Sequence, residues 1–131
     1  MKILVVEDDA LKRTYIVEFL KSRNIDVHWC YSVNPAIKYC IKNQKEISGI
    51  ILDLGLTSYD NSIDYEFTKG LNLVKELTRK KINIPILINS TTYINLKEIM
   101  ESHDNVKGQM YESDDYETLR FFIKDLKREK Q

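Results

Sequence analysis

MKILVVEDDA, residues 1–10, is an apolar run that ends in three consecutive acids, Glu7, Asp8 and Asp9. The uninterrupted apolar residues at 3–6 are typical of a strand that is buried on both faces, as in a parallel sheet. Like charges at the end of such a strand repel one another, and each resists losing its water. A bound cation would remove this repulsion, so the stretch predicts a central strand with a cation site at its end.

Apolar runs and helix-period segments alternate along the rest of the chain. The expected strands are 2–6, 27–31, 49–54, 84–89 and 106–111, and the expected helices are 9–23, a segment from 34, 71–77, 96–101 and a segment from 115. Asp9 and Asn34 are expected to cap their helices, and Pro35 suits a first turn because its missing N–H would be unpaired there. Five βα units with buried strands predict a doubly wound α/β domain, with a parallel sheet covered by helices on both faces.

Length and charge restrict the class of protein. The chain has 131 residues with 20 basic and 20 acidic side chains, which predicts a single domain over 1–131 with no output domain and argues against a nucleic-acid binder. No signal peptide or membrane-spanning run is found, so we expect a cytoplasmic protein. Cys30 and Cys40 are expected to be buried thiols, and no neighbouring residue gives His28 or His103 a catalytic role.

Acidic and hydroxyl residues end three of the expected strands. The first strand ends in Glu7 and Asp8, the third in Asp53, and Ser90 follows the fourth. In a doubly wound sheet, ligands bind outside the carboxyl ends of the strands. If the first and third strands are neighbours, their carboxylates meet in one pocket, where oxygen ligands suit Mg²⁺ better than zinc. The alternative is that these acids are merely solvated strand ends.

Three segments, ILVVEDD at 3–9, IILDLGL at 50–56 and PILINS at 85–90, together resemble a response-regulator receiver domain of two-component signalling. The resemblance extends over nearly the whole chain and implies a flavodoxin-like sheet with strand order 2-1-3-4-5. It implies that Asp53 accepts a phosphoryl group from a histidine kinase or a phosphotransfer protein. It also implies that Ser90 hydrogen-bonds this group, and that Mg²⁺ is held by Glu7, Asp8, Asp53 and the backbone carbonyl of Gly55.

The sequence departs from the family pattern at its fifth strand. The family has an aromatic residue, two spacers and then Lys-Pro, whereas this chain has QMYES at 109–113, with Gln109 at the aromatic position and Glu112 at the lysine position. A unit charge pair about 4 Å apart is worth roughly 4 kcal/mol at an effective dielectric near 20. An inward-pointing Glu112 would therefore add to the acid cluster and repel a phosphoryl group, whereas a solvent-facing Glu112 would be nearly silent.

A second departure is the segment 55–70, which is expected to be an unusually long connection beside the site, with Thr57 in place of a proline. It is either a functional cover or partner surface, or a surface insertion.

Two functions stay open at this stage. The first is a stand-alone receiver that is phosphorylated at Asp53 and thereby changes its affinity for an unidentified protein target. The second is a pseudo-receiver, a binding module that signals without stable phosphorylation. The stretch 53–57 faintly resembles the DxDxT loop of aspartate-nucleophile phosphatases, but Gly55 cannot supply the second carboxylate that those enzymes need. We therefore expect a protein that is not an enzyme and that binds neither nucleic acid nor membranes.

Overall fold

Strands and helices alternate through the whole fold. The computed structural model describes residues 1–54, 63–90 and 94–129, and the side chains of 63–69 lie outside the description. The strands in these ranges are β1 (Lys2–Val6), β2 (Asp26–Cys30), β3 (Ile47–Asp53), β4 (Ile86–Asn89) and β5 (Val106–Met110). The helices are α1 (Ala10–Ser22), α2 (Val33–Asn43), α3 (Ile63–Arg79), α4 (Leu96–Ser102) and α5 (Tyr116–Glu129). This alternation confirms the five βα units.

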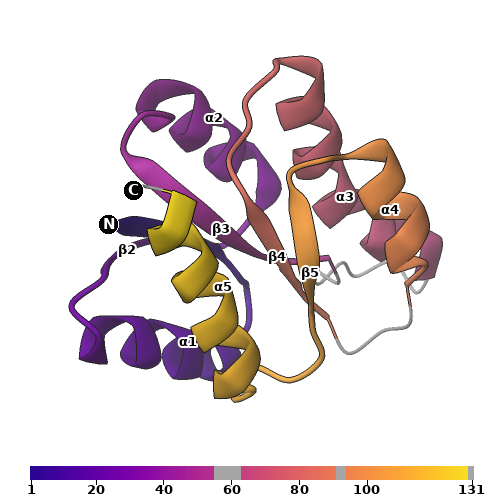
Figure 1. Ribbon diagram of the computed structural model, residues 1–131. Coiled ribbons are helices and arrows are strands. Elements are labelled where there is room, and N and C mark those ends of the chain that lie inside the picture. Colours follow the sequence, from indigo (N-terminus) through magenta and orange to yellow (C-terminus); the bar gives the residue numbers. More distant parts are fainter. Residues whose placement is uncertain (55–62, 91–93, 130–131) are drawn as a thin grey trace.

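The five strands form one parallel sheet in the order β2-β1-β3-β4-β5 (Figure 1). β1 lies between β2 and β3, and β4 joins β3 to the edge strand β5. The strand order reverses after β2, because the chain adds β2 on one side of β1 and every later strand on the other. The predicted doubly wound, flavodoxin-like sheet is therefore confirmed, and the carboxyl ends of β1 and β3 are neighbours.

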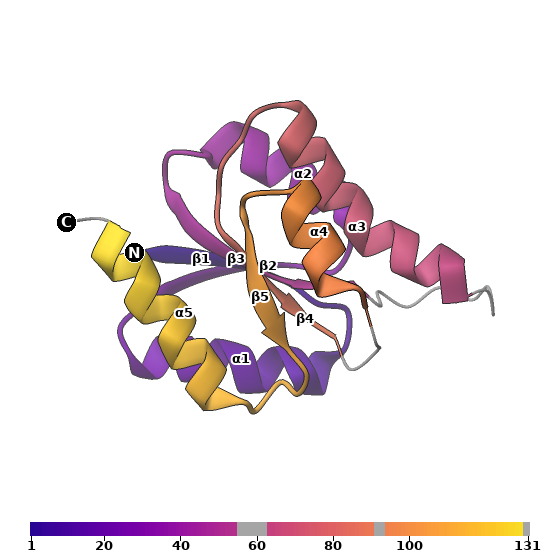
Figure 2. The same cartoon turned by 45° about the vertical axis from the view of Figure 1, so that its right-hand side comes forward.

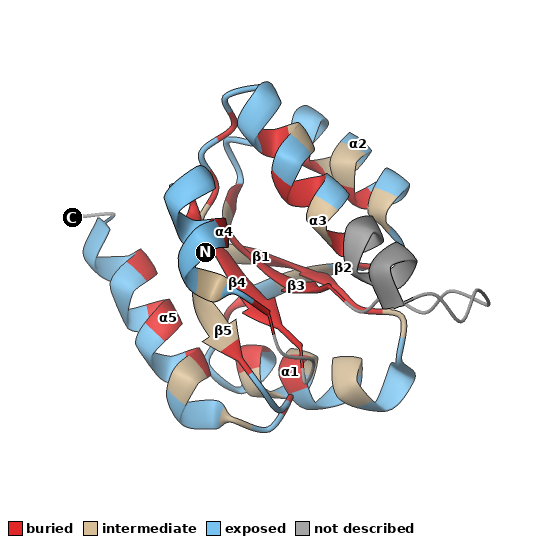
Figure 3. Ribbon diagram, turned by 90° about the vertical axis from the view of Figure 1, so that its right-hand side faces the viewer, coloured by how far each residue is buried: buried red, intermediate tan, exposed pale blue. Residues whose placement is uncertain are grey.

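The sheet separates two apolar cores (Figures 2 and 3). On one face α1 and α5 pack through Ile16, Leu20, Phe122 and Leu126 against alternate strand residues such as Ile51. On the other face α2, α3 and α4 cover the remaining strand residues through Ala36, Cys40, Leu73, Leu77 and Ile99. Because successive side chains of a strand point to opposite faces, an apolar run without polar interruption is what a sheet covered on both sides requires.

Several element boundaries differ from the sequence expectation. The prediction that Asn34 caps a helix is wrong: α2 begins at Val33, with Ser32 at the cap position, so Asn34 lies inside the first turn. Pro35 is still in that turn, where a missing N–H breaks no hydrogen bond. Tyr31 and Tyr111 lie just beyond β2 and β5, and β4 begins only after Pro85. Pro85 still accepts a hydrogen bond from Ile50 N–H at 2.9 Å through its carbonyl.

The interpretation of 55–70 as one long connection is wrong over its second half, because α3 already begins at Ile63. Gly70 is therefore inside a helix. A Cβ at this residue would lie 2.4 Å from Leu54 Cα and 2.8 Å from the Asp53 carbonyl oxygen. Only glycine lets the helix backbone approach the end of β3 this closely. Gly55 and Thr57 lie outside the described residues.

Two further expectations concern thiols and membranes. Cys30 and Cys40 are free and buried, as predicted, and burial raises the pKa of Cys40 to about 12. No helix in the described ranges combines the length and the apolar character that crossing a bilayer requires.

Candidate functional site

One row of side chains crosses the carboxyl edge of the sheet. Asp53 pairs with Asn89 in the register of β3 and β4, and Glu7 follows Val6, the β1 partner of Leu52. Since strand side chains alternate between faces, Glu7, Asp53 and Asn89 all point to the face that α1 and α5 cover. All three are buried, with exposed fractions of 1%, 6% and 4%. Three neighbouring strands therefore place polar groups side by side in a site that is largely closed to water.

The acids predicted as metal ligands lie together. Each of Glu7, Asp8 and Asp53 offers a carboxylate oxygen, and these oxygens lie within 4.8 Å of one another. Asp8 is half-buried, so the cluster is open to solvent on its side. Carboxylate oxygens are the ligands that hard divalent cations such as Mg²⁺ prefer. The donor set therefore fits the predicted ion, and the fourth predicted ligand, Gly55, lies outside the described residues.

The titration of Glu7 reflects this crowding. Burial is the main factor that raises the pKa of Glu7 from 4.5 to about 9, and the hydrogen bond and negative charge of Asp53 act in the same direction. A hydrogen bond between two carboxyl groups requires a proton, so the pair carries one proton at neutral pH without a cation. The backbone N–H of Asp9 and the charge of Lys12 oppose the rise in pKa. A bound cation could replace the proton.

Helix α1 holds the backbone around Glu7. Asp9 caps this helix as predicted, because its Oδ1 accepts hydrogen bonds from the N–H groups of Leu11 at 2.9 Å and Lys12 at 3.0 Å. Arg13 donates from Nη1 to the Glu7 carbonyl at 3.2 Å, and its guanidinium lies 4.7 Å from the centre of the Tyr31 ring. Asp9 is thus a structural residue, in agreement with the sequence interpretation.

Ser90 and Gln109 are neighbours across the last two strands. Ser90 follows β4, is 5% exposed, and donates its N–H to the Met110 carbonyl at 3.0 Å. The Gln109 side chain donates from Nε2 to the Ser90 carbonyl at 2.9 Å. The position at which the family has an aromatic residue thus lies beside the predicted phosphoryl-sensing hydroxyl, and in this chain an amide holds the Ser90 backbone there. The assigned roles of both residues stay predictions.

Glu112 does not join the acid cluster. Its side chain is exposed in the turn between β5 and α5, and the carboxylates that the described residues bring together are those of Glu7, Asp8 and Asp53. The inward-pointing alternative for Glu112 is therefore wrong, and the solvent-facing alternative agrees with the structure.

Two site residues escaped the sequence interpretation. Asn89 donates from Nδ2 to Glu7 Oε1 at 3.3 Å and to Ser113 Oγ at 3.2 Å. Ser113 is 8% exposed and lies between β5 and α5. Asn89 could have been found from its position in the sequence, because it is a polar residue that ends the apolar run of β4, as Asp53 ends that of β3. Ser113 offered no such signal, because it lies in a polar turn.

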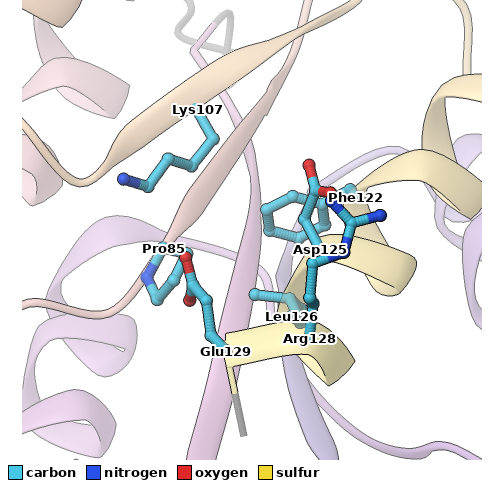
Figure 4. Close-up of a pocket in the computed structure, with 7 residues that line it drawn as sticks. All are labelled: Pro85, Lys107, Phe122, Asp125, Leu126, Arg128 and Glu129. Atoms are coloured by element: carbon cyan, nitrogen blue, oxygen red, sulfur yellow. Dashed lines mark ion pairs between the residues drawn. The ribbon is translucent and has the colours of Figure 1, made fainter. Parts of the chain in front are cut away.

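A surface hollow of about 350 Å³ lies at the other edge of the sheet (Figure 4). Pro85, which precedes β4, and Lys107, near the start of β5, form one side, and the last turns of α5 form the other. This hollow belongs to the amino edge of the strands, opposite to the acids. Lys107 thus lies at the edge of the sheet opposite to the acid cluster.

Comparison with known sequences identifies one curated relative. No protein-family model matches the chain. The response regulator ArlR of Staphylococcus saprophyticus is 30% identical over 125 residues, a match that covers 95% of this chain and 48% of that protein. The chain therefore spans about half the length of this relative.

Solved structures share the fold over nearly the whole chain. A two-component response regulator from Clostridium difficile has a TM-score of 0.76 at 20% identity, covering 98% of this chain and 96% of that one. The receiver domain of the Francisella response regulator 1452 has a TM-score of 0.72 at 22% identity, covering 99% and 98%. Vibrio cholerae chemotaxis protein CheY4 has a TM-score of 0.71 at 19% identity, covering 95% and 97%. At these identities the solved structures show the fold alone, so the chain has the fold of the receiver domains of two-component response regulators, and over 95% of its length its sequence is similar to that of the response regulator ArlR.

Proposed function

We propose that this receiver accepts a phosphoryl group on Asp53 with Mg²⁺ bound, and that phosphorylation changes its affinity for a protein partner. The observation that carries the proposal is the set of three carboxylates of Glu7, Asp8 and Asp53, whose oxygens lie within 4.8 Å of one another. The donor of the phosphoryl group would be a histidine kinase or a phosphotransfer protein.

Asp53 is the proposed nucleophile because it ends the central strand β3 in the middle of the polar row. One of its carboxylate oxygens forms a bond to phosphorus while the bond from phosphorus to the donor's imidazole nitrogen breaks. The imidazole leaves with the electron pair of that bond. Such a transition state is loose, so the protein's task is mainly to position groups and to offset charge.

The proposed ligands of Mg²⁺ are the Asp53 carboxylate together with Glu7, Asp8 and the Gly55 carbonyl. When bound, this ion supplies positive charge that offsets the charge on the transferred group. The backbone of Glu7 is held by α1, whose Arg13 donates to the Glu7 carbonyl at 3.2 Å. The hydroxyl of Ser90 is the proposed hydrogen-bond donor to the phosphoryl group.

A pseudo-receiver, which binds partners without stable phosphorylation, is the second candidate. It is favoured by Gln109, whose amide donates to the Ser90 carbonyl where the family has an aromatic residue, and by the missing lysine at position 112, where the exposed Glu112 supplies no positive charge for a phosphoryl group. Both features weaken the family's usual means of stabilising and sensing a phosphoryl group.

Intact-mass spectrometry separates the two candidates. The wild-type protein, incubated with acetyl phosphate and Mg²⁺, should gain the mass of one phosphoryl group, and Asp53→Asn should gain none. Asp9→Asn is the matched control, because asparagine also caps helices and the residue lies outside the proposed ligand set. Labelling that survives in Asp53→Asn refutes the assignment of the nucleophile. A wild-type protein that binds Mg²⁺ but gains no mass supports the pseudo-receiver.

A further inference from the structure

The side-chain amide of Asn89 joins the acid cluster to the start of α5. Asn89 ends β4 and points to the α1 and α5 face, as Glu7 and Asp53 do. From β4 it reaches past the intervening strand β3 to Glu7, next to β1, at 3.3 Å. The same nitrogen donates to Ser113 Oγ at 3.2 Å. Both N–H groups of one amide are therefore used, one on each side.

The burial of Asn89 makes these two bonds necessary. With an exposed fraction of 4%, its amide is removed from water, and a buried amide without partners is strongly destabilising. Leu87, two residues earlier on the same face of β4, is apolar and packs in the α1 and α5 core. An aliphatic side chain at position 89 would continue that core, but it would leave Glu7 Oε1 and Ser113 Oγ without this donor.

The amide is also shared between two acceptors at some distance from both. N–H···O hydrogen bonds in proteins usually measure about 2.7–3.2 Å, so the bond of 3.2 Å to Ser113 lies at the long end of this range and the bond of 3.3 Å to Glu7 lies just beyond it. The amide cannot approach one acceptor without changing its distance to the other. A displacement of the Glu7 carboxyl therefore alters the bond to Ser113.

We propose that Asn89 is a positioning residue of the acid site, which orients the Glu7 carboxyl beside Asp53 and couples it to the segment between β5 and α5. The coupling reaches α5 because Asp115, two residues after Ser113, binds the first turn of that helix, accepting from Thr118 N–H at 3.2 Å. The positioning itself needs no ion, whereas its effect on cation affinity rests on the proposed Mg²⁺ site.

The first arm of the test uses the protein in EDTA and reads the carboxyl carbon resonance of Glu7 by NMR. Ser113→Ala should shift this resonance, because the amide then relaxes toward Glu7. Ser113→Thr, which keeps the hydroxyl, should restore the wild-type position. In an Asn89→Leu background, Ser113→Ala should leave the Glu7 resonance where it was. The inference is overturned if Ser113→Ala does not shift the Glu7 resonance, or if it shifts this resonance equally in the Asn89→Leu background.

The second arm measures Mg²⁺ affinity by titration. Removing a residue that orients a metal ligand typically lowers affinity roughly 10-fold to 100-fold, and we expect Asn89→Leu to fall in this range. Asn105→Leu is the matched control: Asn105 is 7% exposed and donates to the Ile84 carbonyl at 3.1 Å, ahead of β4 at the other edge of the sheet. Equal losses in both variants mean that Asn89 is only structural.

The two experiments test the proposed function and the proposed role of Asn89 separately. If the wild-type protein binds no Mg²⁺, the proposed function fails, while the EDTA arm still decides whether Asn89 couples Glu7 to Ser113. If Asn89→Leu does not fold, the side-chain amide protons of Asn89 replace it as the probe. One of them should shift in Ser113→Ala and return in Ser113→Thr, and two unmoved protons overturn the inference.

Discussion

Substituting Glu7 with glutamine should remove a large pH dependence from the stability of the metal-free protein. In the folded protein the pKa of Glu7 is raised from 4.5 to about 9, chiefly by burial and then by Asp53, so the folded state keeps a proton that the unfolded chain has lost. The stabilisation from this proton is complete below pH 4.5 and is lost as the pH rises toward 9. Each pH unit in this window is worth about 1.4 kcal/mol.

As the pH rises from about 5 to about 8, the free energy of unfolding of wild type should therefore fall by roughly 4 kcal/mol because of Glu7. Glutamine cannot ionise, and it can replace both interactions of the protonated acid: its amide N–H can donate to Asp53, and its oxygen can accept from Asn89. Wild type and Glu7→Gln should have similar stability near pH 5, and the variant should be the more stable protein near pH 8.

Urea denaturation in EDTA across this pH range measures the difference directly. Glu112→Gln is the control, because it removes the same charge at an exposed position. Its stability curve should run parallel to that of wild type. If the Glu7→Gln curve also runs parallel to wild type, Glu7 does not hold a proton in the folded state, and the reasoning from burial is refuted.

Three further predictions concern the cation, the turn after β5 and the packing of α3. Millimolar Mg²⁺ should raise the melting temperature of wild type at about pH 8, where the ion competes with the Glu7 proton. The melting temperature of Asp8→Asn should not change, and equal melting curves of wild type with and without Mg²⁺ count against the site. Glu112→Lys should alter Mg²⁺ affinity less than about twofold, because the residue is exposed, and a larger change in a titration would show that the turn closes over the acids. Gly70→Ala should destabilise the fold by about 1–3 kcal/mol in urea denaturation, since its Cβ would lie 2.4 Å from Leu54 Cα, whereas Asn72→Ala at an exposed position of the same helix should not.

The fold and the acid cluster were predictable because they depend on short-range pattern. Apolar runs bounded by acids mark buried parallel strands, and the residue after such a run is necessarily at the carboxyl edge of the sheet. Glu7 and Asp53 were found in this way. The same logic would have included Asn89, but a neutral amide at a strand end is less conspicuous than a charge.

Other features depend on three-dimensional contacts that no local pattern carries. A glycine such as Gly70 is typical of a helix end, yet Gly70 lies within α3. A glycine is needed there because the helix backbone closely approaches Leu54, which belongs to another part of the sequence. The orientation of Glu112 is set by the turn between β5 and α5. The bond from Asn89 to Glu7 joins residues 82 positions apart. These features follow from packing between elements, which the sequence pattern does not specify.

The close approach at Gly70 also determines in which direction the site can respond. The Asp53 side chain points to the α1 and α5 face, but the Asp53 carbonyl lies where it leaves no room for even a methyl group on α3, on the other face. The end of β3 therefore has no free space behind it. If Asp53 gains or loses a bulky charged group, the strand cannot retreat from it, so the displacement must spread sideways along the row, toward Glu7 on one flank and Asn89 on the other. A backbone contact on one face would thus direct the response to a chemical change on the opposite face into the plane of the sheet.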